Sequence, residues 1–316
     1  MSEYRPEWYG TGSSVVNKNG DILVIDYGCP GKGEVICYDL ADGIQLMFQD
    51  METDAVIPSN SFGTDIISVN YCIKGRQEST FRDNTVSYMP EQHMSVNGTV
   101  SLPRFFCFPL KVYRGISVVI ERDRLSAETK NMLSCFSIDP DEIETRLRLK
   151  DKWFICLPEK HVQNIFSELE EMKHSSDVIY LRLKALELLH LLSGMENTED
   201  STHDYFPTRM IDITKSIRDD MVSDTLFHIP IEEYTSRYGI STSLFHRIFL
   251  QIYGDTPYVH LKKYRMNIAA GMLCDTDMKI CDIAAESGYS NASKFSGAFS
   301  SVYGMTPRDY RRINKK

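Results

Sequence analysis

The sequence predicts an α+β protein with an N-terminal antiparallel β-barrel or cupin-like domain, a helical pair, and an all-α C-terminal domain containing two helix-turn-helix units. Between residues 12 and 122, short runs of β-branched and aromatic residues alternate with Gly, Asn, Asp and Pro. Helical periodicity replaces this pattern from residue 126, and a short helical motif at residue 245 recurs at residue 295. With 316 residues, 42% of them hydrophobic, the chain is long enough for about two domains.

The β domain is predicted to cover residues 1–125. Its strand-like runs are rich in Val, Ile, Tyr and Phe and are separated by turn-forming residues, which is typical of an antiparallel sandwich or barrel. The expected strands are residues 21–28, 33–40, 44–50, 64–73, 78–84, 85–90, 94–102 and 113–121.

Residues 126–200 are predicted to form a helical dimerisation segment and a linker. Two helices are expected, at 161–174 and 177–194, and the second begins with Asp177 as N-cap and ends at Gly194. Apolar residues recur along the second helix every three or four positions, which fits either packing on its own barrel or an intersubunit seam in a homodimer; both can hold. The residues of this stripe are Val178, Leu181, Ala185, Leu188 and Leu192. The polar and acidic segment 195–207 is expected to be a linker.

The formal net charge of -9 is unevenly distributed along the chain. Residues 208–316 carry 15 Lys and Arg against 12 Asp and Glu, and the rest of the chain carries 20 against 32. Six of the 15 cations lie in the last 23 residues. The average charge therefore does not exclude a polyanionic partner for the C-terminal domain.

The sequence predicts neither a membrane span nor a secretion signal. No run of 18 or more apolar residues occurs, and the first residues, MSEYRPEWYG, lack a basic end followed by an apolar stretch. A cytoplasmic protein without a membrane partner is expected.

The C-terminal domain, residues 208–316, shows the outline of a helix-turn-helix twice. A helix opens at Pro230, with acidic residues in its first turn, and ends at Gly239, after which Ser241 can cap a second helix. The same sequence of signals recurs at Gly288 and Ser290. Two short helices joined by a glycine turn are typical of this motif.

The stretches FHRIFLQIYGDTP, 245–257, and FSGAFSSVYGMTP, 295–307, are copies of one helical frame. Aromatic residues at i and i+4 and an aliphatic residue at i+7 lie on one helical face and predict a buried core, while Gly and Thr-Pro end one helix and start the next. The residues between these anchors differ, so the outward surfaces differ. An all-helical bundle with a duplicated element and no ligand is the alternative.

The second helix of each unit begins with small hydrogen-bonding residues, as expected where a recognition helix meets bases and phosphates. The copies are fifty residues apart and joined by a helical segment, 257–273. This arrangement fits the separation of roughly 34 Å between successive major grooves on one face of double-stranded DNA. The candidate DNA-binding residues are Ser241, Thr242, Ser243, His246, Arg247, Ser290, Asn291, Ser293, Lys294, Ser296 and Gly297.

From about Pro230 to Arg312 the chain resembles the AraC/XylS transcription regulators, and among them the branch typified by pyochelin-type siderophore regulators. The resemblance to the family rests on the motifs SKFSGAF and YGMTPRDYRR and on these single residues: Arg265, Met266, Ala269, Leu273, Ile283, Ala284, Gly288, Tyr289 and Ser290. The resemblance to the branch rests more loosely on NYCIKGRQES, residues 70–79. It implies a cytoplasmic regulator, more often an activator, that binds promoter DNA, with the barrel and helical pair as sensor and dimerisation module. RNA polymerase is a further partner to expect.

Two departures from the family pattern matter. The first unit has Thr235 where a small residue is usual, so its hydroxyl needs a partner, and the second has Gly297 where a long polar or basic residue is frequent. We therefore expect direct base contacts from the first unit, with Arg247 pairing with guanine. The second unit is expected to bind mainly the DNA backbone, with Lys294 on a phosphate or a nearby base.

A β domain ahead of a DNA-binding domain suggests a switch operated by a small-molecule effector. Aromatic and cationic residues in its strands and loops are the candidate ligands, with ordinary core and surface roles as the alternative: Tyr71, Arg76, Phe81, Arg82, Tyr88 and His93.

An enzyme is not expected, nor is a cofactor or a metal. The rival interpretation, a cupin-type metalloenzyme fused to a DNA-binding domain, needs several histidines, and residues 1–160 contain His93 alone. A further alternative is an architectural DNA-binding protein without effector, which predicts similar affinity for any DNA.

Overall fold

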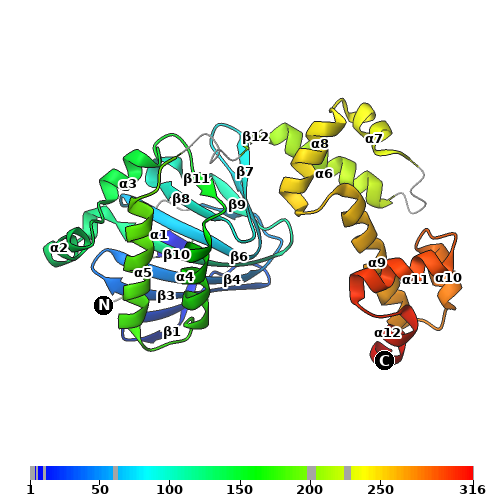
Figure 1. The fold of residues 1–316 in the computed structure, drawn as a ribbon, viewed down its shortest axis with the longest axis horizontal. Helices are drawn as coiled ribbons and strands as arrows, with labels where there is room; N and C mark the ends of the chain where they lie inside the picture. The colour runs from blue at the N-terminus through cyan, green and yellow to red at the C-terminus, as the bar shows by residue number, and fades with distance from the viewer. Residues whose placement is uncertain are drawn as a thin grey trace. The chain divides into compact units, whose positions relative to one another are not determined.

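The computed structural model of the chain describes residues 4, 6–9, 12–59, 63–197, 204–223 and 229–315. The chain divides into two compact units, Met1–Pro207 and Thr208–Lys316 (Figure 1). Part of the predicted linker, residues 198–203, lies outside the described residues. The α+β architecture, a curled antiparallel sheet followed by a helical domain, is confirmed.

The first unit is built on one antiparallel sheet with the strand order β1-β2-β3-β4-β10-β6-β7-β12. Strands β8 and β9 also pair with β6, β11 pairs with β8, and β5 pairs with β9. The bounds are β1 Ser14–Asn19, β2 Ile22–Asp26, β3 Lys32–Ala41, β4 Ile44–Glu52, β5 Ile57–Pro58, β6 Ile66–Thr80, β7 Thr85–Pro90, β8 Met94–Gly98, β9 Phe105–Cys107, β10 Val112–Glu121, β11 Phe154–Cys156 and β12 Phe206–Pro207.

The strand expected at 78–84 does not exist as a separate element. Glu78–Thr80 is the end of the long strand β6, and the chain then turns before β7, where Phe81 N–H donates to the carbonyl oxygen of Thr85 at 2.8 Å. Asn84 adopts a left-handed conformation there, with φ 60°. Polar residues at 82–84 suit such a turn better than a strand interior.

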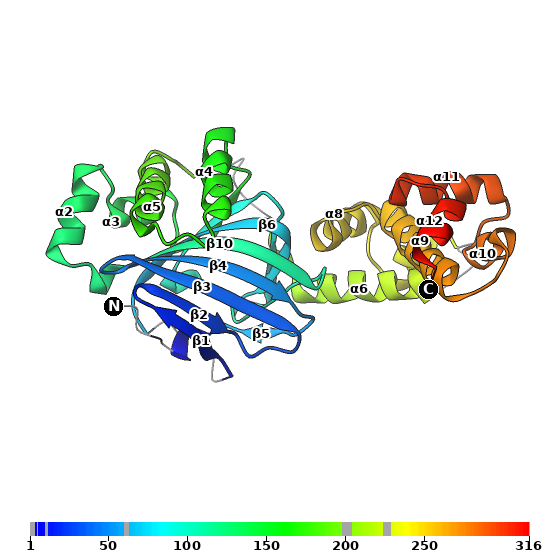
Figure 2. The same cartoon turned by 90° about the horizontal axis from the view of Figure 1, so that it is seen from below.

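Helices α4 and α5 lie side by side on one face of the sheet (Figure 2). Asp177 caps α5 as predicted by accepting from the backbone N–H of Tyr180 at 3.0 Å, and Gly194 is the C-cap. Tyr38 of β3 donates its hydroxyl proton to the carbonyl oxygen of Lys173 between the two helices. The helices of this unit are α1 Pro6–Tyr9, α2 Ala127–Cys135, α3 Pro140–Arg146, α4 Lys160–Glu171 and α5 Val178–Ser193, with two 3₁₀ turns, Thr99–Ser101 and Arg122–Arg124.

Strand alternation gives the sheet two different faces, because successive side chains point to opposite sides. Leu46 and Phe48 of β4 belong to the large core cluster beneath α4 and α5, as do Val69 of β6 and Val118 of β10. This face is mostly apolar, and the Tyr38 hydroxyl and the Asp50 carboxylate are polar groups on it. The residues between them point the other way and line a cavity.

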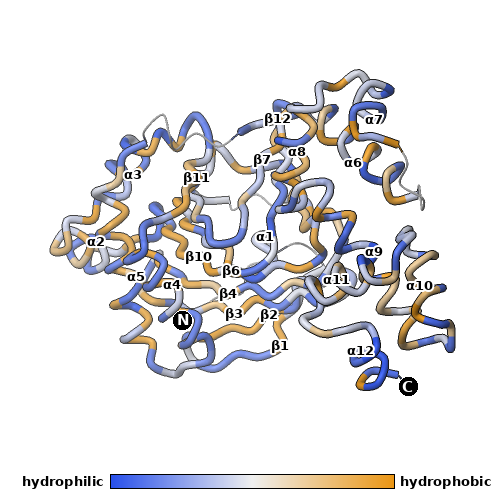
Figure 3. Tube along the Cα trace, turned by 45° about the vertical axis from the view of Figure 1, so that its right-hand side comes forward, coloured by the Kyte–Doolittle hydropathy of each residue, from blue (hydrophilic) through white to orange (hydrophobic). Residues whose placement is uncertain are grey.

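The second unit consists of helices alone within the described ranges: α6 Thr208–Ser223, α7 Ile231–Tyr238, α8 Thr242–Tyr253, α9 Pro257–Asp275, α10 Ile280–Glu286, α11 Ala292–Tyr303 and α12 Pro307–Asn314. Thr256 and Thr306 cap α9 and α12 by accepting from the backbone N–H three residues on, and proline occupies the first turn of each. Most of α12 is hydrophilic (Figure 3).

Candidate nucleic-acid interface and a cavity in the sheet domain

The first helix-turn-helix unit is formed by α7 and α8. Gly239 ends α7 in the left-handed conformation, with φ 67°, and Ser241 Oγ then accepts from the N–H of Leu244 to cap α8. The hydroxyl of Thr235 finds the partners that the sequence requires. It donates to the carbonyl oxygen of Glu232 at 3.1 Å and lies 3.0 Å from the hydroxyl of Thr242.

The second unit repeats this geometry in α10 and α11, with one difference in the cap. Gly288 is left-handed, with φ 80°, but Asn291 caps α11 where Ser290 was expected. The Asn291 side-chain oxygen accepts from the backbone N–H groups of Ser293 at 2.7 Å and of Lys294 at 3.2 Å. Only the amide N–H₂ of Asn291 is left to donate to a ligand.

The duplicated aromatic frame is buried in both copies. Phe245 and Phe249 of α8 are 0% exposed with ring centres 5.4 Å apart, and Phe295 and Phe299 of α11 are 0% exposed at 5.9 Å. Both helices end at a left-handed glycine, Gly254 with φ 76° and Gly304 with φ 71°. Arg247 and Gly297, midway between the anchors of each copy, are exposed, whereas Ile248 is buried with the aromatic residues.

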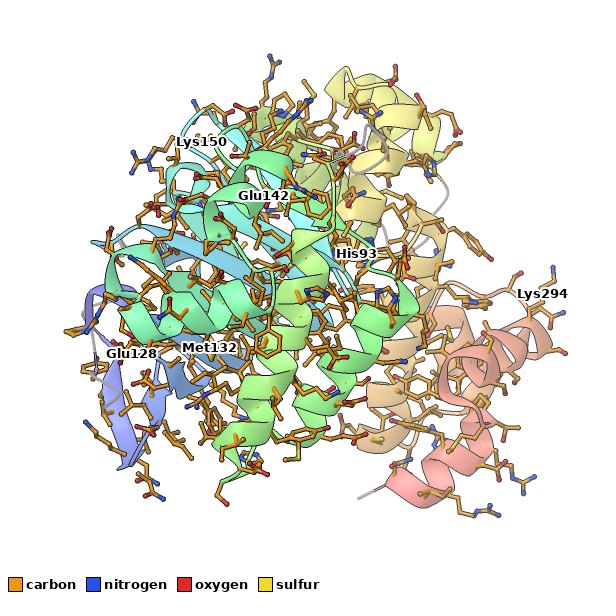
Figure 4. All side chains as sticks on the ribbon, turned by 60° about the vertical axis from the view of Figure 1, so that its left-hand side comes forward. His93, Glu128, Met132, Glu142, Lys150 and Lys294 are labelled. Atoms are coloured by element: carbon orange, nitrogen blue, oxygen red, sulfur yellow. The ribbon has the colours of Figure 1, made fainter. Side chains whose placement is uncertain are left out.

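The predicted DNA-binding residues lie on these outward surfaces. On α8, Thr242 and His246 are half-buried, and the His246 ring packs edge-on against Phe245. On α11, Ser296 is half-buried and donates to the carbonyl oxygen of Ala292. The Lys294 side chain projects from α11 toward solvent (Figure 4). The exposed members of the set are Ser241, Ser243, Arg247, Ser290, Asn291, Ser293, Lys294 and Gly297.

A cavity of about 170 Å³ lies on the sheet face opposite α4 and α5. A row of uncharged polar side chains forms one side of it: Gln49, Ser68, Asn70, Ser95, Asn97 and Ser117. Strand register brings them together, since Asn70 is opposite both Ser117 on β10 and Ser95 on β8, and Ser68 is opposite Asn97.

Asn70 is the centre of the hydrogen-bond network in this row. Its side-chain oxygen accepts from the hydroxyls of Ser117 at 2.7 Å and Ser68 at 2.9 Å, and its amide nitrogen donates to Asn97 at 2.8 Å. Gln49 donates from its amide nitrogen to Ser117 at 2.8 Å. Ser68, Ser95, Asn97 and Ser117 are at most 7% exposed, whereas Asn70 and Gln49 are half-buried.

The rest of the lining is mostly apolar, with Ser59 and Gln77 as its other amide or hydroxyl side chains of Ser, Asn and Gln type. Its aromatic residues are Trp8, Tyr9, Tyr27, Phe106, Phe108, Tyr113 and Trp153. Phe108 and Tyr113 stack at 4.8 Å, and Tyr9 meets Tyr27 edge to face. Burial raises the pKa of Tyr27 and of Tyr113, so both phenols stay neutral across the physiological range. The described residues that line the cavity include no charged side chain.

None of the six candidate effector residues lines this cavity. Tyr71 is one position from Asn70 and therefore points to the opposite face, where its ring stacks on Phe166 of α4 at 4.2 Å. Phe81 packs against Trp153 and Tyr205 from the outside of the cavity lining.

The remaining four candidates are spread over the strands and turns. Arg76 is 9% exposed, and Arg82 is exposed in the turn after β6. Tyr88 donates its hydroxyl proton to Glu78 at 2.6 Å. His93 is half-buried beside the backbone of Glu91 (Figure 4), and burial lowers its pKa.

Sequence reasoning missed the polar row, although a signal for it was present. The strings Ser68-Val69-Asn70-Tyr71 and Ser95-Val96-Asn97 alternate small polar residues with large apolar ones. In a strand buried on both sides, such alternation places hydrogen-bonding groups on one internal face.

The five residues predicted for a dimer seam pack on the chain's own sheet. Leu181, Ala185, Leu188 and Leu192 are at most 1% exposed in the core cluster, and Val178 packs against the same cluster. Of the two alternatives for this stripe, packing on its own domain is what the structure contains. The outer side of α5 carries Ile179, 68% exposed, and Leu183, 55% exposed.

Two features are absent from the described part of the chain. No group of three or more His, Cys, Asp and Glu side chains among them is arranged to hold a metal ion. No helix among them has the length and apolar character needed to cross a membrane.

Residues 234–313 match the family model of the helix-turn-helix domain. This range begins inside α7 and includes the rest of the first unit, the helix α9 and the second unit. Residues 234–313 form an AraC-type helix-turn-helix domain.

Transcription regulators from several bacteria are similar to part of this chain. The HTH-type transcriptional regulator ExsA of Pseudomonas aeruginosa is 29% identical over 82 residues, covering 26% of this chain and 30% of ExsA. The RCS-specific HTH-type transcriptional activator RclR of Escherichia coli is 35% identical over 81 residues, covering 26% of this chain and 28% of RclR. Both alignments thus span less than a third of the relative's own length.

A crystal structure of ToxT from Vibrio cholerae O395 aligns with 86% of this chain and 98% of that chain, at 13% identity and a TM-score of 0.30.

The AraC-type helix-turn-helix domain includes the two departures noted in the sequence. Thr235 has its hydroxyl satisfied inside the first unit. Gly297 faces open space, because a Cβ atom built there would have no atom within 4 Å. The absence of a side chain at 297 is therefore not required by packing.

Proposed function

We propose that the protein is a sequence-specific DNA-binding transcriptional regulator whose promoter binding is modulated by a small molecule held in the sheet domain. The observation that carries this proposal is the helix-turn-helix domain at 234–313, in which the polar first turns of α8 and α11 are exposed on buried aromatic frames. Exposed hydrogen-bonding residues at the start of a second helix are what contact base edges and phosphates in this motif.

Helix α9 supports the idea that both units bind one DNA duplex. It has 19 residues and is therefore roughly 28 Å long at 1.5 Å per residue. This length is of the order of the roughly 34 Å that separates successive major grooves on one face of the duplex. A rigid connecting helix fixes the separation of the two recognition helices before DNA is bound.

The two recognition helices differ in the contacts that they can make. Arg247 on α8 is exposed and has the geometry to pair with the O6 and N7 atoms of guanine, and Ser243 lies one turn earlier. On α11 the outward residues are small, and Lys294 is its one cation. The proposal therefore assigns base selection mainly to the first unit and phosphate binding mainly to the second.

Titration of the full chain on fragments of its own upstream DNA, with systematic base changes, tests this division. Arg247→Ala is expected to lose about 1 to 3 kcal/mol of discrimination at one base position. Lys294→Ala is expected to lower the affinity for all DNA sequences alike. It should also reduce the slope of log affinity against log salt concentration by about one. Arg82→Ala removes one exposed arginine from the sheet domain and serves as the charge-matched control.

Three outcomes contradict the proposal. If neither Arg247→Ala nor Lys294→Ala changes affinity, the recognition surface is elsewhere. If Arg82→Ala has the same effect as Lys294→Ala, the change reflects net charge alone. If the wild-type protein binds every fragment equally at fixed salt, it is an architectural DNA-binding protein and not a regulator.

The three parts of the chain have separate roles in the proposed regulator. The β domain up to residue 125 senses the effector, residues 126–200 mediate dimerisation, and residues 208–316 bind DNA in the cytoplasm, with activation through RNA polymerase. We also place the protein in the pyochelin-type branch of the AraC/XylS regulators, and the similarity of Asn70–Ser79 to that branch supports this placement. Because the inward stripe of α5 is already packed, the homodimer seam would use Ile179 and Leu183. Leu183→Glu should shift the sedimentation of a dimer to that of a monomer, whereas Leu157→Glu, at another exposed leucine, should not.

A further inference from the structure

Resting on the proposed effector function, we infer that the cavity of the sheet domain takes an uncharged, single-ring aromatic ligand that carries one group able both to donate and to accept hydrogen bonds. A primary carboxamide and a phenol hydroxyl are groups of this class. The inference follows from the size of the cavity, the absence of charge in its lining, and the position of its polar groups on one side.

The size limits the ligand to about one ring. The cavity measures about 170 Å³. An apolar protein cavity of about 150 Å³ accommodates benzene, so this cavity has room for a substituted six-membered ring. A fused bicyclic ligand would require the surrounding aromatic side chains to move.

The lining excludes a ligand with a net charge. Its described residues are all neutral, and burial keeps the two tyrosines Tyr27 and Tyr113 protonated. A carboxylate in this position would lose its hydration without gaining a cation, which costs several kcal/mol. The cations Arg76 and Arg82, which the sequence suggested for an anionic effector, do not line the cavity.

The polar row supplies the hydrogen-bonding complement. Asn97 is 3% exposed, and its amide nitrogen donates to no residue in the described part of the chain, so it can donate to a ligand oxygen. The side-chain oxygen of Gln49 is buried and accepts no hydrogen bond from the described residues. A ligand carboxamide or hydroxyl can satisfy either atom, by accepting from Asn97 or by donating to Gln49.

The distribution of polarity favours an aromatic ring over a sugar. Six of the eight Ser, Asn and Gln side chains that line the cavity belong to the polar row on the sheet, and the facing walls include Trp8, Phe106, Phe108 and Trp153. A sugar has hydroxyls around its whole rim, and those facing the aromatic walls would lose their hydrogen bonds with water. An aromatic ring with one polar edge leaves no such group unpaired and gains ring contacts of about 0.5 to 1.5 kcal/mol each.

The chain provides its own probe for this cavity. It has two tryptophans, Trp8 and Trp153, and both line the cavity, so intrinsic tryptophan fluorescence responds to a ligand bound there. The full chain, without DNA, is titrated separately with benzamide, benzoate, toluene and D-glucose at neutral pH. Benzamide and benzoate have nearly the same shape and differ in charge, while toluene lacks the polar edge.

Benzamide should give a saturable fluorescence change and raise the thermal unfolding midpoint. Benzoate should bind at least about tenfold more weakly because its charge is not compensated, and toluene should bind more weakly than benzamide. D-glucose should have no effect. Equal or tighter binding of benzoate overturns the inference, as does a response to D-glucose without one to benzamide. Failure of benzamide to bind overturns it as well.

Two variants separate a specific site from a general change of the fold. Asn97→Leu should weaken benzamide and leave toluene bound, whereas Gln49→Lys should reverse the preference from benzamide to benzoate by placing a cation in the cavity. Unchanged benzamide and benzoate affinities in folded Gln49→Lys would contradict the assignment. Because these measurements contain no DNA, their failure leaves the DNA-binding proposal standing, and failure of the promoter titration leaves the ligand class standing.

Discussion

The amide nitrogen of the half-buried Asn70 on β6 donates to the side-chain oxygen of the buried Asn97 on β8 at 2.8 Å. The same Asn70 side chain accepts from the hydroxyls of Ser68 and Ser117. One amide thus satisfies three other polar side chains, and its removal would leave them without these partners.

Asn70→Leu should therefore lower the free energy of unfolding of the sheet domain. Each buried polar group left without a partner costs about 1 to 3 kcal/mol, so a loss at or above the lower end of that range is expected. Urea unfolding followed by tryptophan fluorescence measures it, since both tryptophans are in this unit. Asn17→Leu, at an exposed asparagine of β1, is the matched control and should change stability little. Equal effects of the two substitutions would refute the network.

Phe295→Ala should unfold or strongly loosen the second helix-turn-helix unit. Phe295 is 0% exposed in the cluster formed with Met266, Leu273 and Ile283, and truncation of such a phenylalanine costs about 3 to 5 kcal/mol. Loss of helical circular dichroism at a lower urea concentration measures the effect. Ile313→Ala, at a residue 63% exposed on α12, should leave the transition in place. A stable Phe295→Ala domain would show that the aromatic frame does not form the core.

Substitution by alanine should change the stability of the domain in opposite directions at Gly297, inside α11, and at Gly304, its C-cap. Gly297 lies inside the helix with open space around a built Cβ, so Gly297→Ala should stabilise the domain by about 0.5 to 1 kcal/mol through helix propensity. Gly304 is left-handed, with φ 71°, and Gly304→Ala should destabilise it by about 1 kcal/mol or more. Thermal unfolding of the two variants against the wild type tests both signs. Destabilisation by Gly297→Ala would mean that residue 297 is constrained.

The stability of the second unit should fall as the pH is lowered from about 6.5 toward 4. Burial, and next the charge of Arg218, lower the pKa of His260 from its ordinary value of 6.5 to about 4. The unfolded chain therefore takes up this proton more readily than the folded chain, so acid favours unfolding in that range. His260 Nε2 also accepts from Arg218 Nε at 3.4 Å, a contact that protonation removes.

Urea midpoints of the helical signal at pH 7.5 and pH 5 measure this effect. His260→Gln should reduce the difference between the two values, while His161→Gln, at an exposed histidine of α4, should preserve it. An identical pH dependence in the wild type and in His260→Gln would contradict the role of His260.

The helical half could be predicted closely because local chemistry specifies it. Gly239, Ser241 and the Thr-Pro pairs at 256 and 306 fix helix ends within a few residues, and the aromatic spacing defines the buried face. The exception, Asn291 as cap in place of Ser290, is a shift of one residue between two side chains that can both cap a helix. Which of the two residues caps the helix depends on the backbone geometry of the turn, and sequence spacing alone does not determine that geometry.

The ligand cavity could not be predicted in the same way because it depends on strand register. Tyr71 was a reasonable candidate from composition, yet it is one residue from Asn70 and so lies on the other side of the sheet, against Phe166. Long-range pairing also joins Glu78–Thr80 to β6, and Phe154–Cys156 to β8. No local sequence pattern in either segment indicates which strand it pairs with.

The buried frames of α8 and α11 have a consequence for how such a protein can diverge. Since the buried Phe249 and Phe299 anchor the two helices, substitutions at an outward position such as Gly297, where a built Cβ meets no atom within 4 Å, should leave the fold intact. Either copy can thus acquire a new target preference while the other keeps its own, and a duplicated gene of this design needs few mutations to serve a different promoter.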